Sequence, residues 1–94
     1  MKIFPNYDGV KSASLKLKGL IRVTPLDLNK RLSDSFGASI FLKREDLQQI
    51  RSFKIRGAYN KISSLDSNER RKGIVCASAG NHAQGLPILA KSCK

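Results

Sequence analysis

The 94-residue sequence lacks any long hydrophobic run. No apolar stretch approaches the ~20 residues that a membrane-spanning helix needs, so we expect no membrane partner. The first eight residues also lack the apolar stretch of a secretory signal, which favours a cytoplasmic location. Repeats and compositional bias are absent, and this excludes collagen, coiled-coil and low-complexity classes. The length suits one small domain at most.

Cysteine and histidine are nearly absent. Only Cys76, Cys93 and His82 occur, and the two cysteines form neither a CxxC pair nor a metal-ligand spacing. Two cysteines are too few for a disulfide scaffold, so we expect both thiols to be reduced. A zinc site made from protein ligands alone would need unusual ligands, and no metal is expected.

Acidic residues are scarce: 7 Asp and Glu stand against 18 Lys and Arg, which gives a formal net charge of +11. Such a charge is a cue for nucleic-acid binding. The basic residues are scattered, however, and their only run is Arg70-Arg71-Lys72. Because no helix-turn-helix, zinc finger or RNP-type motif is present, we expect no specific nucleic-acid partner, only weak and salt-sensitive binding to polyanions.

Apolar residues recur at helical spacing in three segments, which predicts helices near 8–18, over 26–36 and from Ser52 onward. Ser52 can cap the third helix, whose apolar stripe would be Ile55, Tyr59, Ile62 and Leu65. Gly19 and Gly37 are placed to end the first two. Thr24 precedes a proline and is expected to be extended.

The apolar run 39–43 predicts a strand, and the run 74–77 predicts a second, buried strand. Between them, Asp66-Ser67-Asn68-Glu69 offers a capping box for a short helical turn closed by Gly73. A last helix should start near Asn81, with a kink or an early end at Pro87. Strands that alternate with helices indicate an α/β domain with short parallel strands and flanking helices. Two strands are too few for a complete parallel sheet, so residues 1–94 are expected to be an incomplete domain.

Two polar segments follow the predicted strands, where ligands bind in open α/β sheets. The first is Ser78-Ala79-Gly80-Asn81-His82-Ala83-Gln84-Gly85. Small residues let the backbone approach a ligand, and a turn that opens into a helix presents N–H groups to an anion. This predicts a carboxylate or phosphate site. An ordinary capped helix start would have the same pattern.

The second segment is Ser52-Phe53-Lys54-Ile55-Arg56-Gly57-Ala58. Lys54 falls in the first helical turn, where the helix dipole and partial burial beside Phe53 would favour the neutral amine. A neutral amine is the nucleophile that forms Schiff bases with carbonyls. A solvated lysine on a polar face is the alternative. The enzymatic reading requires the amine of Lys54 to lie near the 78–82 bend rather than in bulk solvent.

These two segments, together with Lys43-Arg44-Glu45-Asp46-Leu47-Gln48 and Thr24-Pro25-Leu26, resemble the serine/threonine dehydratase family. The resemblance covers residues 10–92. It implies the tryptophan synthase β-like fold of fold-type II enzymes and pyridoxal 5'-phosphate (PLP) as cofactor. The implied substrate is threonine or serine. The implied reaction is the conversion of threonine to 2-oxobutanoate and ammonia, in isoleucine biosynthesis.

The resemblance also implies residue roles. Lys54 matches the lysine that holds PLP and moves protons at the substrate α-carbon, and Phe53 matches the residue that packs on the pyridine ring. Asn81 matches the side chain that hydrogen-bonds the 3'-oxygen of the cofactor. The substrate carboxylate would be held by Ser78, Gly80, Asn81 and His82.

Some features of that family are missing from the sequence. Its glycine-rich phosphate loop has no counterpart among the seven glycines, and its residue facing the pyridine nitrogen is absent as well. We therefore expect an N-terminal fragment of a dehydratase domain with little activity alone. Such a fragment could associate with a missing second half, with a full-length relative or with another copy of itself. A basic binding module that docks on a relative or on nucleic acid is the alternative function.

Overall fold

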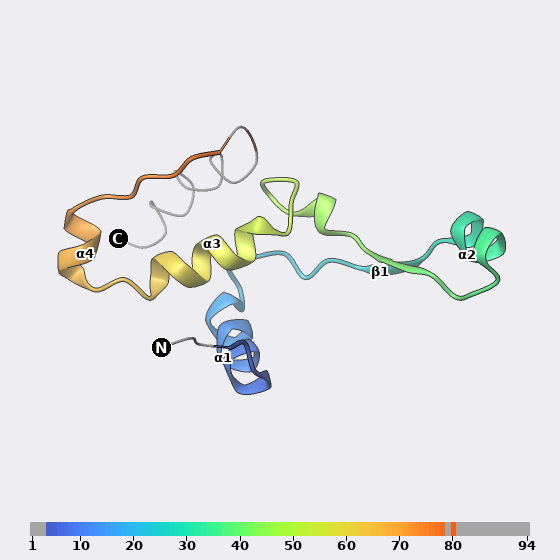
Figure 1. The fold of residues 1–94 in the computed structure, drawn as a ribbon, viewed down its shortest axis with the longest axis horizontal. Helices are drawn as coiled ribbons and strands as arrows, with labels where there is room; N and C mark the ends of the chain where they lie inside the picture. The colour runs from blue at the N-terminus through green and yellow to red at the C-terminus, as the bar shows by residue number, and fades with distance from the viewer. Residues whose placement is uncertain (1–3, 79, 81–94) are drawn as a thin grey trace.

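The computed structural model describes residues 4–78 and residue 80. Helices, a 3-10 turn and a single pair of strands make up this part of the chain (Figure 1). In chain order they are α1 (Tyr7–Leu17), β1 (Leu26–Leu28), α2 (Lys30–Phe36), β2 (Phe41–Lys43), η1 (Glu45–Leu47), α3 (Lys54–Ser63) and α4 (Ser67–Arg71).

α1 confirms the helix predicted near 8–18. It begins after Asn6, whose side-chain oxygen accepts a hydrogen bond from the backbone N–H of Gly9 at 2.8 Å. This N-cap satisfies a donor that the first helical turn leaves without a partner. The helix ends at Leu17, and Gly19 follows with a φ of +80°, a left-handed conformation that glycine adopts without strain. Leu17 is the one residue that α1 buries.

β1 and β2 form an antiparallel pair, with Leu26 opposite Lys43 and Leu28 opposite Phe41. The sequence did not predict β1, and the parallel strands that it predicted were 39–43 and 74–77, so the direction of this pair was not among the predictions. β1, α2 and β2 project from the rest of the described chain (Figure 1). α2 lies at the tip of this projection and turns the chain back along β1. A parallel pair would instead need a connection that returns the chain to the end of the sheet where β1 begins.

The helix predicted over 26–36 starts four residues later, at Lys30. The side chain of Asn29 caps it by accepting from the N–H of Leu32 at 2.9 Å. The extended conformation that Pro25 imposes on Thr24 continues through Leu28, so these residues form a strand instead. The predicted stop is confirmed, because Gly37 has the left-handed φ of +62° at the C-cap.

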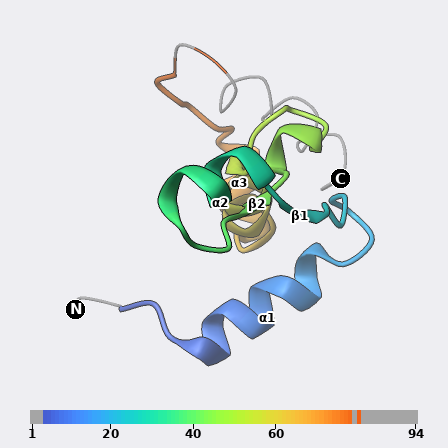
Figure 2. The same cartoon turned by 90° about the vertical axis from the view of Figure 1, so that its right-hand side faces the viewer.

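The hydrophobic core lies along one face of α3. Ile55, Ala58, Tyr59 and Ile62 are buried there and form a cluster with Leu17 and Ile50. α1 is seen lengthwise in Figure 2, where α3 is viewed nearly end-on, so the two contacting helices cross steeply. The predicted stripe is confirmed for Ile55, Tyr59 and Ile62, while Leu65 lies beyond the end of the helix and is half-buried.

The predictions for the segment after α3 are confirmed only in part. The capping box at the start of α4 is confirmed: Asp66 accepts from the N–H of Glu69 at 2.8 Å, and the Glu69 carboxylate accepts from the N–H of Asp66 at 2.9 Å. Residues 74–77 form no strand, because no described segment pairs with them, and Val75 is 98% exposed. The helix expected from Asn81 and its kink at Pro87 lie outside the described residues.

The chain is elongated, with principal extents of 53 × 29 × 26 Å. Its radius of gyration is 16.3 Å, against roughly 12 Å for a compact domain of this length. Within the described part, no helix has the length and apolar character needed to cross a bilayer. The same residues contain no group of three His, Cys, Asp or Glu side chains that could hold a metal ion.

Candidate functional site

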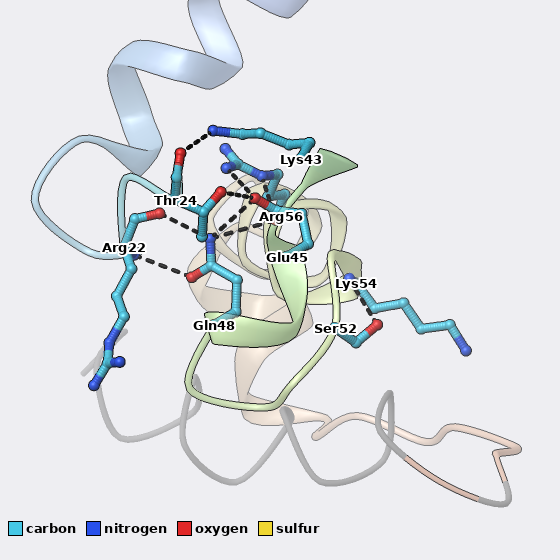
Figure 3. A network of polar contacts seen from close by, with 8 residues as sticks. All are labelled: Arg22, Thr24, Lys43, Glu45, Gln48, Ser52, Lys54 and Arg56. Atoms are coloured by element: carbon cyan, nitrogen blue, oxygen red, sulfur yellow. Dashed lines mark hydrogen bonds and ion pairs between the residues drawn. The ribbon is translucent and has the colours of Figure 1, made fainter. Parts of the chain in front are cut away.

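Lys54 is the first residue of α3 and is exposed. Its side chain points away from the neighbouring polar network (Figure 3), and its amine has no hydrogen-bond partner or ion pair among the described residues. The backbone N–H of Lys54 donates to Oγ of Ser52 at 3.3 Å. Phe53 is 65% exposed. The expected burial of Lys54 beside Phe53 is therefore wrong, since the core face of α3 starts only at Ile55.

Ser52 is not the N-cap of α3. That position belongs to Phe53, which has a helical backbone conformation and no side chain able to accept a hydrogen bond. Of the four residues predicted to hold a carboxylate, Ser78 and Gly80 are described. Both are exposed, and the N–H of Gly80 donates to Oγ of Ser78 at 3.3 Å. Asn81 and His82 lie outside the described residues, so the site roles of Lys54, Phe53 and the 78–82 bend stay predictions.

A polar network that the sequence did not predict lies beside the start of α3, around the Glu45 carboxylate (Figure 3). Arg56 donates two hydrogen bonds to it, from Nε at 2.9 Å and from Nη2 at 2.8 Å. The hydroxyl of Thr24 donates a third, at 2.6 Å. The Glu45 side chain is only 14% exposed. Forked pairing of a guanidinium with a carboxylate is among the stronger polar contacts in proteins.

Gln48 attaches this network to the chain before β1. Its side-chain oxygen accepts from the N–H of Arg22 at 3.1 Å, and its Nε2 donates to the carbonyl of Arg22 at 2.8 Å. Gln48 is 1% exposed, so both bonds are shielded from water. The ammonium of Lys43 donates to the backbone carbonyl of Thr24 beside them.

Among the described groups, the pKa of Glu45 is shifted most. The hydrogen bonds from Arg56 lower the pKa of Glu45 from 4.5 to about 2, and the Thr24 hydroxyl acts in the same direction, although burial opposes both. The same pairing raises the pKa of Arg56. Arg44 lowers the pKa of Asp46 in a neighbouring pair, but there both partners are largely exposed to solvent.

Comparison with known proteins identifies the protein family. The sequence profile of the family "Pyridoxal-phosphate dependent enzyme" matches residues 17–94. The chain belongs to this family, and the resemblance found in the sequence is confirmed.

Curated relatives narrow the comparison. The chain is similar to proteins named biosynthetic L-threonine dehydratase from Staphylococcus epidermidis and Staphylococcus aureus, with 54% identity over 82 residues. That match takes in 87% of this chain and 19% of each relative, so the chain spans about a fifth of their length.

Solved structures show the fold. Maize serine racemase has 33% identity and a TM-score of 0.83, over 93% of this chain and 27% of its own. The processed form of threonine deaminase isoform 2 from Solanum lycopersicum has 36% identity and a TM-score of 0.71, over 99% of this chain and 27% of its own. The fold class is thus that of fold-type II PLP enzymes, and this chain corresponds to part of such a domain.

Proposed function

We propose that this chain is part of an L-threonine dehydratase, which converts L-threonine to 2-oxobutanoate and ammonia with PLP as cofactor. The observation that carries the proposal is the 54% identity to relatives named biosynthetic threonine dehydratase, over a region that includes the segments around Lys54 and Ser78. The structural relatives named serine racemase make serine the second substrate to test.

The described residues fit a PLP site in one respect. The Lys54 amine is exposed, which does not meet the requirement that it lie out of bulk solvent, and most of the 78–82 bend lies outside the described residues. The amine has no partner among the described residues and stands at the start of a helix, where an aldehyde can reach it. When bound, PLP supplies an electron sink for the negative charge that develops at the substrate α-carbon. Lys54 would hold the aldehyde carbon of the cofactor and move the α-proton. The Ser78 hydroxyl is a donor suited to the substrate carboxylate, while the N–H of Gly80 already donates to Oγ of Ser78.

The first test is attachment of the cofactor. The purified chain is mixed with PLP, and absorbance near the visible band of a PLP–lysine linkage is followed. The linkage is then reduced with borohydride, and the modified lysine is identified by mass spectrometry. We expect Lys54 to be modified in preference to Lys61, which lies in the last turn of the same helix. Lys54→Ala should abolish the absorbance and Lys61→Ala should not; equal labelling of both lysines would contradict the proposal.

The second test is turnover. We expect the 94-residue polypeptide by itself to convert little or no threonine, since no glycine-rich run that could hold the PLP phosphate occurs in it. Activity should appear when the same residues are joined to the remainder of a relative's catalytic domain, and Lys54→Ala should remove it. Threonine turnover by the 94 residues alone would show that the phosphate can be held in another way.

A second candidate function is association, and it is favoured by the apolar surface of the projection formed by β1, α2 and β2. Leu26, Leu28, Phe36 and Phe41 are each more than half exposed there, and the radius of gyration exceeds that of a compact domain. Because the relatives are about five times longer than the matched region, we assign this surface to the remaining part of a dehydratase catalytic domain.

The test is size-exclusion chromatography of the chain with and without the remaining part of a relative's domain. Leu28→Ser should weaken complex formation, while Lys30→Ser, on the exposed part of α2, should not. Self-association that the second part does not displace would indicate a homo-oligomer instead. Binding of DNA or RNA that survives physiological salt would favour the basic-module alternative.

A further inference from the structure

The start of α3 has little support from its own residues. Lys54 and Arg56 place two basic side chains in the first turn, where the helix dipole disfavours positive charge, and that turn holds no acidic residue. The N-cap residue, Phe53, has no side chain that can accept a hydrogen bond from the backbone N–H groups of this turn. Gly57 follows, a residue that weakens a helix interior relative to alanine. The local sequence would therefore favour fraying at the residue that carries the amine.

A carboxylate in another segment supplies the negative charge that the first turn of α3 lacks. Glu45, in η1, places its carboxylate against Arg56 through two hydrogen bonds of 2.8 and 2.9 Å. η1 cannot easily move away, because the buried side chain of Gln48 binds the backbone of Arg22 in both directions. Thr24 adds its hydroxyl to the same carboxylate. The first turn of α3 is thus tied to two segments that are distant in the sequence.

We propose that Glu45 and Arg56 are positioning residues: their ion pair, held in place by Thr24 and Gln48, fixes the first turn of α3 and with it the amine of Lys54. The segment 43–48 then acts on α3 through Arg56, and neither Glu45 nor Gln48 touches cofactor or substrate. The consequence for PLP depends on the proposed function of Lys54, whereas the consequence for α3 does not.

The first experiment measures the helix without any cofactor. Hydrogen exchange of backbone amides is compared in the wild-type chain, Glu45→Gln and Thr24→Val. The matched control is Asp34→Asn, which breaks the exposed Lys30–Asp34 pair. We expect Glu45→Gln to speed exchange at residues 56–58 about tenfold, with residues 60–63 of the same helix and those of α1 unchanged. Asp34→Asn should leave all of α3 unchanged. Unchanged exchange at 56–58, or an equal increase along all of α3, would overturn the proposal.

The second experiment measures the amine. PLP is trapped with borohydride in the same variants, and the ratio of modified Lys54 to modified Lys61 is determined. The amine condenses with the PLP aldehyde with loss of water, and borohydride reduces the resulting C=N bond. We expect Glu45→Gln to lower the ratio about tenfold and Arg56→Lys, which keeps the charge but loses the fork, to lower it less. Asp34→Asn should retain the wild-type ratio.

The two experiments separate the possible failures. If the wild type shows no preference for Lys54, the proposed function fails, and hydrogen exchange still decides whether the pair positions α3. If the wild type prefers Lys54 and Glu45→Gln keeps that preference, positioning is refuted while the function stands. If Glu45→Gln does not fold, Thr24→Val decides, because it removes one hydrogen bond to the carboxylate and leaves every charge in place.

Discussion

Acid should weaken this fold through Glu45, and the size of the effect can be worked out from its contacts. The pKa of Glu45 is lowered from its ordinary value of 4.5 to about 2, mainly by the hydrogen bonds from Arg56. A carboxylate whose pKa falls on folding stabilises the folded chain fully above its unfolded pKa. That stabilisation is lost as the pH falls from about 4.5 toward 2.

At face value the lowering corresponds to roughly 3.4 kcal/mol, at ~1.36 kcal/mol for each pH unit. The Arg56 side chain is 37% exposed, however, so water screens the pair. We expect about 1–2 kcal/mol to remain. Glu45→Gln mimics the protonated side chain, because glutamine has nearly the same shape and no charge.

The assay is urea unfolding followed by circular dichroism at pH 7, 5, 3.5 and 2.5. The stability gap between wild type and Glu45→Gln should be constant from pH 7 to 5 and should shrink below that. Asp46 and the other carboxylates are present in both proteins, so their titration cancels in the difference. Asp34→Asn should differ from wild type by less than about 0.5 kcal/mol at neutral pH. A gap for Glu45→Gln that stays the same down to pH 2.5 would refute the reasoning.

Two further substitutions test the packing of α3. Gly57→Ala should raise the free energy of unfolding by about 0.5–1 kcal/mol, because alanine is the better helix former. Apart from its chain neighbours and the backbone of its own helix, a Cβ at Gly57 also meets no atom within 4 Å. A loss of stability in thermal unfolding would show that Gly57 serves some other contact. Ile55→Ala should cost about 2–4 kcal/mol, since this side chain is 1% exposed; a midpoint shift no larger than that of an exposed control, Val10→Ala, would contradict the assigned core.

Local signals in the sequence were sufficient for the elements that depend on local chemistry. The apolar spacing of α3, the Asp66 capping box and the glycine stop after α2 each act within one or two helical turns, and the structure confirms them. β1 was missed because Leu28 continues the i, i+4, i+8 spacing of Leu32 and Phe36, although its spacing from Leu26 is that of a strand. The proline at 25 extends the chain, and the cap at Asn29 lies later than the periodicity indicated.

The polar network could not have been predicted in the same way. Any of the 7 acidic residues could pair with any of 18 basic ones, and only the folded chain brings Glu45 to Arg56 across 11 positions. The segment 43–48, which includes Glu45, is part of the resemblance to the dehydratase family, but that resemblance implies no physical role for Glu45. Burial beside Phe53 was predicted wrongly for a related reason, since helix periodicity says which face of α3 is apolar and not which segments cover its first turn.

The division of α3 into a packed face and an electrostatically held first turn explains why Glu45 matters more than its single ion pair suggests. From Ile55 onward the helix is anchored by apolar contacts with Leu17 and Ile50, which tolerate small shifts because they lack direction. Lys54 stands just before that anchor, next to the uncapped Phe53. Among the described residues, directional contacts hold this end: the Ser52 hydroxyl accepts from the N–H of Lys54, and the Glu45 carboxylate accepts from Arg56 and from Thr24. The amine of Lys54 stands at this unpacked end, and in the described part of the chain Glu45 supplies the fixed negative charge that lies beside it from outside the helix.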